Sequence, residues 1–100
     1  MIGIKKKGRA EATANLKRKN YNRIRQHMQD GTHVADLFDY LYKHDTITPM
    51  ECFEMLDNTR ISSTVSILRH DYGVPVEMEK TTKNHRTYGV YSIDWEGFDV

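Results

Sequence analysis

The sequence has few residues that could cross-link the fold, and it has no long apolar segment that could anchor it in a membrane. Cys52 is its only cysteine, which excludes an intrachain disulfide and a zinc site built from several thiolates. No apolar run approaches the ~18–20 residues that span a bilayer, and the initial segment MIGIKKK lacks the apolar stretch of a signal peptide. We therefore expect a cytoplasmic protein that makes no membrane contact.

Motifs that carry catalysis are also lacking. The sequence has no His-Glu-x-x-His, no paired cysteines and no glycine-rich phosphate loop. Its histidines are dispersed, and helical spacing places Cys52 on the buried side of its helix. Asp36 and Asp39 lie one helical turn apart, as a metal-binding or acid/base pair would. Charged side chains on a solvent-exposed helix face have the same spacing, and we prefer that interpretation. We expect no enzymatic activity, no metal site and no cofactor.

The length sets the scale of the fold. The 100 residues make one domain, because a second core would need roughly another 50–100 residues. Only 38% of the residues are hydrophobic, yet 10% are aromatic. One small core with polar extensions is therefore expected.

Charge divides the chain into two unlike parts. Residues 1–30 contain nine Lys or Arg and two Asp or Glu, which gives a formal charge of +7. Residues 31–100 contain six Lys or Arg and twelve Asp or Glu, which gives a formal charge of −6. The cations of this basic arm are Lys5, Lys6, Lys7, Arg9, Lys17, Arg18, Lys19, Arg23 and Arg25. Such a density suits a polyanion, since each phosphate that a cation neutralises releases counterions. Double-stranded DNA is the expected partner.

The basic arm is expected to be part tail and part helix. Tyr21, Ile24 and Met28 lie at i, i+3 and i+7, which favours a helix over 15–29. The segment 1–9 contains a lysine cluster interrupted by glycines and is expected to be a mobile tail.

Three further helices follow from their apolar spacing. The first ends near His44. The second, 49–56, opens with a capping box, in which the Thr48 hydroxyl and the Glu51 carboxylate each accept from the other residue's backbone amide. The third runs from 60 to 72. Their expected apolar sides are Val34, Leu37, Phe38 and Leu41; then Cys52, Phe53 and Leu56; then Ile61, Val65, Leu68 and Tyr72.

Beyond Pro75 the apolar period changes from helical to alternating, which predicts a two-stranded hairpin. Its strands are expected at 74–79 and 88–93, and the polar residues 81–86 form its tip. Val76 and Met78 are expected on one face of the first strand. The chain thus divides into a basic arm (1–30), a domain of helices and a hairpin (31–94) and an aromatic tail (95–100).

The central residues resemble a known family. Ile47-Thr48-Pro49-Met50-Glu51, Thr59-Arg60-Ile61-Ser62-Ser63, Leu68-Arg69 and Tyr72-Gly73-Val74-Pro75-Val76 are similar to motifs of the small winged helix-turn-helix proteins of bacteriophages. The resemblance covers about 34–93. It implies a mainly α fold with a β-hairpin wing (α+β), here preceded by the basic arm. It also implies DNA binding in a bacterial cytoplasm or nucleoid. Thr64 and Ile67 depart from the family, whose members often have arginine and aspartate there.

In that arrangement the helix 60–72 is expected to enter the major groove. Opposite its apolar stripe lie Thr59, Ser63, Ser66 and His70, flanked by Arg60, Ser62 and Arg69. The hairpin adds Lys80, Lys83, His85 and Arg86 for phosphate contacts, beside the cations of the basic arm. A solvated surface would present the same residue types. The expected role is that of a regulator or accessory factor in DNA transactions.

The acidic charge of residues 31–100 supports a different hypothesis. An acidic surface can occupy a DNA-binding channel, so the protein could bind and inhibit a host nucleic-acid or defence enzyme. The aromatics expected to be exposed for such contacts are Tyr40, Tyr42, Trp95 and Phe98; the alternative for Trp95 and Phe98 is that they cap the core. Glu77 and Glu79 on the hairpin also oppose DNA contact. A homodimer fits the first function, because half-site readers are often dimers.

Overall fold

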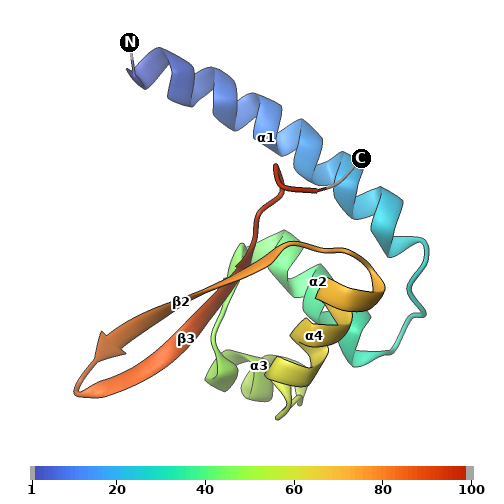
Figure 1. Ribbon diagram of the computed structural model, residues 1–100, viewed down its shortest axis with the longest axis vertical. Coiled ribbons are helices and arrows are strands. Elements are labelled where there is room, and N and C mark those ends of the chain that lie inside the picture. Colours follow the sequence, from blue (N-terminus) through green and yellow to red (C-terminus); the bar gives the residue numbers. More distant parts are fainter. Residues whose placement is uncertain (1, 99–100) are drawn as a thin grey trace.

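The computed structural model describes residues 2–98, with side chains from residue 14 onward (Figure 1). Its elements are α1 (Ile2–Arg25), α2 (His33–His44), β1 (Thr46–Ile47), α3 (Pro49–Leu56), α4 (Ile61–Asp71), β2 (Val76–Lys83) and β3 (Arg86–Ile93). The strands form one antiparallel sheet in the order β1-β3-β2. Residues 2–98 thus fold as an α+β structure, as expected. Over this part of the chain, no helix combines the length and apolar character needed to cross a membrane.

Helix α2 is the centre of the core. It packs against α1, α3, α4 and β1, and its Leu37, Phe38 and Leu41 are fully buried. In Figure 1, α1 crosses on one side of α2, and α3 and α4 lie on the other. The expected apolar side of this helix is confirmed, because Leu37, Phe38 and Leu41 are fully buried and Val34 packs against the same core.

Helix α3 begins as the sequence predicts. The Thr48 hydroxyl accepts from the Glu51 amide at 3.1 Å, and the Thr48 amide donates to the Glu51 carboxylate at 3.0 Å. The prediction for its apolar side is wrong at Phe53, which is 50% exposed, whereas Cys52 is fully buried. Phe53 lies about 100° around the helix from Cys52, and a helix of only two turns offers α2 a narrow face.

Helix α1 is longer than expected. The predicted tail over 1–9 is wrong, because the helix begins at Ile2 and continues to Arg25. Lysine, arginine and alanine, which are common in α1, are good helix formers, and an isolated glycine costs only ~1 kcal/mol. The helix ends at Arg25 rather than at 29, so Ile24 is buried on α1 as predicted, whereas Met28 is buried beyond the end of the helix.

The hairpin is also longer than expected. Its tip is the two residues Asn84 and His85 rather than 81–86, and both have a positive φ (52° and 65°). Two successive positive φ angles define the tight turn that matches strand twist. Met78 is 44% exposed rather than buried beside Val76, because β2 leaves the core after its first residue. The hairpin therefore projects from the body (Figure 1).

The sheet gains a third strand that the sequence did not reveal. Thr46 pairs with Ser92 and Ile47 with Tyr91, so that β1 joins the base of the hairpin to the end of α2. The Ile47 side chain is fully buried. Two residues are too few to show an alternating pattern, which is why this strand escaped prediction.

The aromatic tail belongs to the core. Trp95 and Phe98 are 6% and 7% exposed, so they cap the core, and the alternative in which they are exposed for contact with another molecule is wrong. Their rings stack at 5.5 Å, and Trp95 also contacts Phe38 at 5.6 Å. The Trp95 carbonyl accepts from the buried Asn20 side chain at 2.8 Å. The segment after β3 therefore ties α1 to α2. Tyr40 and Tyr42 are half-buried rather than exposed.

Candidate nucleic-acid interface

Helix α4 presents one apolar and one polar face. Ile61, Val65 and Leu68 are buried, which confirms most of the predicted stripe. Thr59, Ser62, Ser63, Ser66 and His70 are all exposed, on the face that the sequence assigned to DNA. The helix has no carboxylate before Asp71, its last residue. Its outer face thus carries hydroxyls and cationic or neutral polar groups, together with the apolar side chain of Ile67, which is 42% exposed.

The turn that aims α4 is fixed by Asn58, a residue not predicted from the sequence to have a role. Asn58 is 3% exposed. Its side-chain oxygen Oδ1 accepts from the Arg60 backbone amide at 2.8 Å, and its side-chain nitrogen Nδ2 donates to the Thr64 hydroxyl at 2.9 Å. The Thr64 hydroxyl donates in turn to the Arg60 carbonyl at 3.2 Å. Asparagine before a helix favours such a local cap, and its position just before α4 is the sequence feature that could have indicated it.

Thr64 lies on the inner side of α4. It is 5% exposed, so its hydroxyl does not face a ligand on the outer face of the helix. The threonine instead stabilises the turn before α4.

The two arginines of the α4 region differ in their partners. Arg69 donates from Nε and from Nη2 to the Val76 carbonyl, at 3.1 Å and 2.8 Å. Its guanidinium therefore joins α4 to the start of β2. Arg60 is exposed at the beginning of α4, and its guanidinium has no partner among the side chains that the structure describes. Of these two arginines, Arg60 is the one whose donors are available for a ligand.

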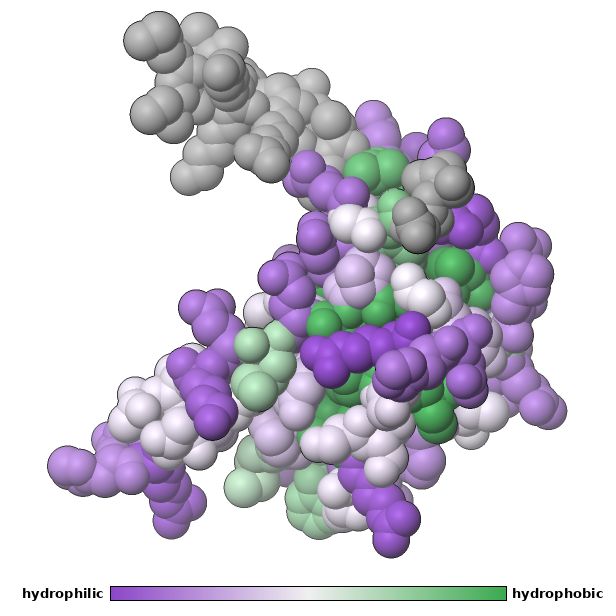
Figure 2. Space-filling model, viewed as in Figure 1, coloured by the Kyte–Doolittle hydropathy of each residue, from purple (hydrophilic) through white to green (hydrophobic). Residues whose placement is uncertain are grey.

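The hairpin tip carries the cations of the sheet. Lys83 and Arg86 flank the turn and, with Asn84 and Tyr88, line an open hollow of about 560 Å³. His85 occupies the turn itself. Figure 2 shows hydrophilic residues covering this far end of the molecule. The tip is thus shaped to contact an anion rather than an apolar surface.

The two glutamates of β2 lie apart from the tip. Glu79 and Lys83 are four residues apart, or ~13 Å along the strand. Glu77 lies farther toward the body. Lys80 lies on the opposite face of the strand from both glutamates, because side chains alternate. A ligand at the tip therefore meets cations before it meets a carboxylate.

The described cations of α1 fall into two groups. Lys17 is held by Asp45 at 2.6 Å and lies over the Tyr42 and Trp95 rings at 5.3 Å and 5.9 Å. Arg25 pairs with Asp39 and Asp30. The other three, Arg18, Lys19 and Arg23, are exposed. The side chains of Lys5, Lys6, Lys7 and Arg9 lie outside the described part of the chain.

Asp39 is a structural carboxylate. Tyr21 donates to it at 2.6 Å and Arg25 at 2.9 Å, so the expectation of a solvated charge is wrong for this residue. Burial, followed by the hydrogen bond to Asp39, raises the pKa of Tyr21 to about 12. The protonated hydroxyl is thus favoured in the folded protein.

Alkaline titration should reveal this contact. One of the six tyrosines is expected to ionise near pH 12, and Tyr21→Phe should remove that step from the absorbance titration. Since the folded pKa exceeds the ordinary value of 10, the contribution to stability is complete below pH 10 and declines between pH 10 and 12. Asp39→Asn should move the step toward pH 10. A Tyr21 that ionises near pH 10 in the wild type would contradict the contact.

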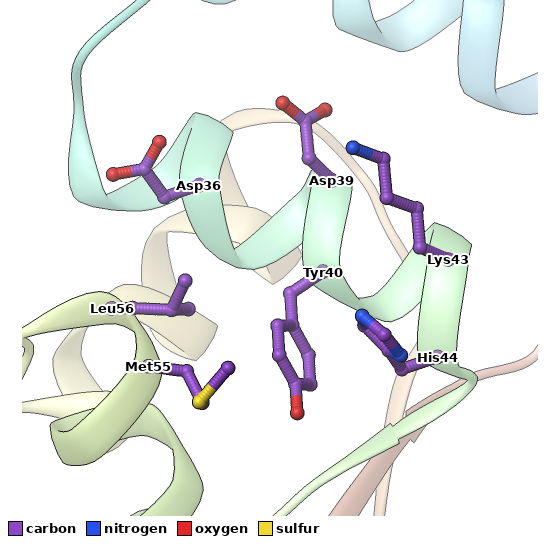
Figure 3. Close-up of a pocket in the computed structure, with 7 residues that line it drawn as sticks. All are labelled: Asp36, Asp39, Tyr40, Lys43, His44, Met55 and Leu56. Carbon is purple, nitrogen blue, oxygen red and sulfur yellow. The ribbon is translucent and has the colours of Figure 1, made fainter.

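The acidic residues of α2 border a different surface. Asp36, Asp39, Tyr40, Lys43 and His44 of α2, with Met55 and Leu56 of α3, line a hollow of about 300 Å³ (Figure 3). Both carboxylates point away from the Tyr40 ring and Met55 in this view. This hollow lies between α2 and α3, so its carboxylates are not part of the outer face of α4.

The structure thus gathers some predicted site residues and separates others. The turn before α4, the outer face of α4 and the hairpin belong to one continuous segment, whereas α1 lies across α2 from α4 (Figure 1). No group of three or more potential metal ligands occurs within the described residues. Searches with the chain matched no protein-family model, no curated protein and no solved structure.

Proposed function

We propose that this protein is a winged helix-turn-helix that binds double-stranded DNA and catalyses no reaction. The element order supports this assignment: a helix, a short strand, two helices joined by a tight turn, and a hairpin whose sheet the short strand completes. In such a unit, the second helix of the turn enters the major groove and the hairpin lies beside it as a wing.

The outer face of α4 is the observation that carries the proposal. Residues 31–100 have a formal charge of −6, yet from Thr59 to His70 there is no carboxylate. Serine and threonine hydroxyls can bond to phosphates or base edges, and Arg60 can bond to guanine. Within this acidic part of the chain, an exposed helix face without a carboxylate is a surface suited to a polyanion.

The hairpin tip and α1 supply the electrostatic contacts. We assign the phosphate contacts of the wing to Lys83 and Arg86, which line the hollow at the hairpin tip. Arg18, Lys19 and Arg23 are the described cations of α1 that no carboxylate engages, so they can release counterions on binding. Occupying DNA in this way suits a regulator or an accessory factor of DNA transactions, in the cytoplasm or nucleoid of a bacterium.

Salt dependence tests the proposal. The affinity of the full chain for a generic duplex should fall linearly with salt on a logarithmic scale. Replacing Arg18, Lys19 and Arg23 with glutamine should lower the slope by about 1 for each phosphate that is no longer neutralised. Anisotropy titrations at several salt concentrations measure both. Lys43→Gln is the matched control, since this exposed cation borders the acidic hollow and should leave the slope unchanged. Absence of duplex affinity at low salt would refute the function.

Exposed apolar side chains on α3 support a second candidate function, inhibitory binding to a nucleic-acid or defence enzyme. Met50, Phe53 and Met55 are 60%, 50% and 65% exposed, and Met55 lines the hollow of Figure 3. Such groups are more typical of a protein contact than of a DNA contact. Phe53→Gln should leave DNA affinity unchanged but remove a partner that still copurifies after nuclease digestion.

A further inference from the structure

Strand β2 forms an open edge of the sheet. The order β1-β3-β2 leaves β2 with a neighbour on one side only, and every residue from Glu77 to Lys83 is exposed. Figure 1 shows the hairpin extending away from the helices, so no other element of residues 2–98 covers this edge. An unpaired edge of this length is a template for another strand.

The turn geometry determines which backbone groups face outward. In a two-residue hairpin loop, the flanking residues Lys83 and Arg86 form a hydrogen-bonded pair, and such pairs alternate with non-bonded ones along the strand. Thr81 and Glu79 therefore bond toward β3. The amides and carbonyls of Thr82 and Lys80 point away from β3, where an added strand would meet them.

The side chains of this edge complement themselves in one register. A second, antiparallel copy of β2 related by a two-fold axis must place residues of the same face opposite each other, so the axis passes through a residue. An axis at Glu79 sets two glutamates opposite each other. An axis at Lys80 sets Glu77 opposite Lys83 twice, but it also sets two lysines opposite each other. An axis at Thr81 sets Glu79 opposite Lys83 twice. Like charges in direct opposition are unfavourable, whereas opposite charges are favourable.

We propose that the protein forms a symmetric dimer in which two β2 strands pair edge to edge about Thr81. The result is one six-stranded sheet with two bodies at its ends. Glu79, which opposes DNA contact on the hairpin, is then neutralised by Lys83 of the second copy. Lys83 is then engaged by Glu79 and is not free for a phosphate, whereas Arg86 lies on β3 and keeps its charge for the DNA contact that we assign to the hairpin tip. The dimer rests on the sheet alone and does not depend on the proposed DNA binding.

Charge exchange tests the pairing. Two short hairpins bury little surface, so a weak dimer is expected, and sedimentation equilibrium of the full chain at low salt up to about millimolar concentration should detect it. Glu79→Lys and Lys83→Glu should each weaken dimerisation by roughly tenfold or more, because each sets like charges opposite each other twice. The double variant, and an equimolar mixture of the two single variants, should restore it.

Lys80→Glu is the matched control. It changes the net charge by the same amount as Lys83→Glu, but its neighbour in this register is Thr82, so dimerisation should change little. Circular dichroism of each variant verifies the fold. A protein that remains monomeric at about millimolar concentration would overturn the proposal. So would a dimer that the single variants leave intact, or one that the exchanged pair does not restore.

Discussion

Replacing Trp95 with alanine is expected to lower the free energy of unfolding by ~3–5 kcal/mol, the range for deleting a large buried aromatic. Trp95 is 6% exposed and contacts Phe38, Tyr42 and Phe98 at ring-centroid distances of 5.6, 5.8 and 5.5 Å. Its ring also lies beneath the Lys17 ammonium. Alanine would leave a cavity where α1, α2 and the C-terminal segment meet.

Denaturant unfolding followed by circular dichroism measures this decrease, since the only tryptophan is removed. Trp95→Phe is the control: it keeps an aromatic ring against Phe38 and Phe98 and should cost much less than alanine. If Trp95→Ala changes stability by under about 1 kcal/mol, the site does not contribute the burial that the structure gives it.

Features with local causes could be predicted from the sequence. The capping box at Thr48 and Glu51 needs only residues three apart, and the stripe of α4 follows from Ile61, Val65 and Leu68. Features with distant causes could not. Trp95 is buried because Phe38 and Phe98 surround it, and no nearby residue signals that contact. A two-residue strand such as β1 exists only because β3 is there to pair with it.

The candidate site shows the same division. The exposed row on α4 follows from the helical wheel and was predicted residue by residue. The sequence did not predict which cations are free to bind a ligand, because that depends on whether a partner from another part of the fold engages them. Arg69 is engaged by the Val76 carbonyl, Arg25 by Asp39, and Lys17 by Asp45, which is 28 residues away. In the sequence alone, all of them are equal candidates for phosphate.

That difference in availability leads to an expected result for DNA recognition. Two-pronged contacts to base edges require arginine, lysine, asparagine or glutamine, and the serines on the outer face of α4 are too short to make them. Arg60 is the described side chain of this face with a free guanidinium, at the helix end that meets bases in helix-turn-helix proteins. Sequence preference should therefore be confined to about one G·C pair.

Competition between duplexes that differ at single positions measures this preference, which should amount to about 5- to 150-fold for one guanine contact. Arg60→Ala should abolish it, and Arg60→Lys should reduce it while keeping most of the affinity, because lysine retains the charge but replaces the rigid fork of guanidinium donors by a flexible ammonium. Arg69→Lys is the matched control and should leave the preference intact, since Arg69 already donates to Val76. A preference that survives in Arg60→Ala but disappears in Arg69→Lys would assign base recognition to the other arginine.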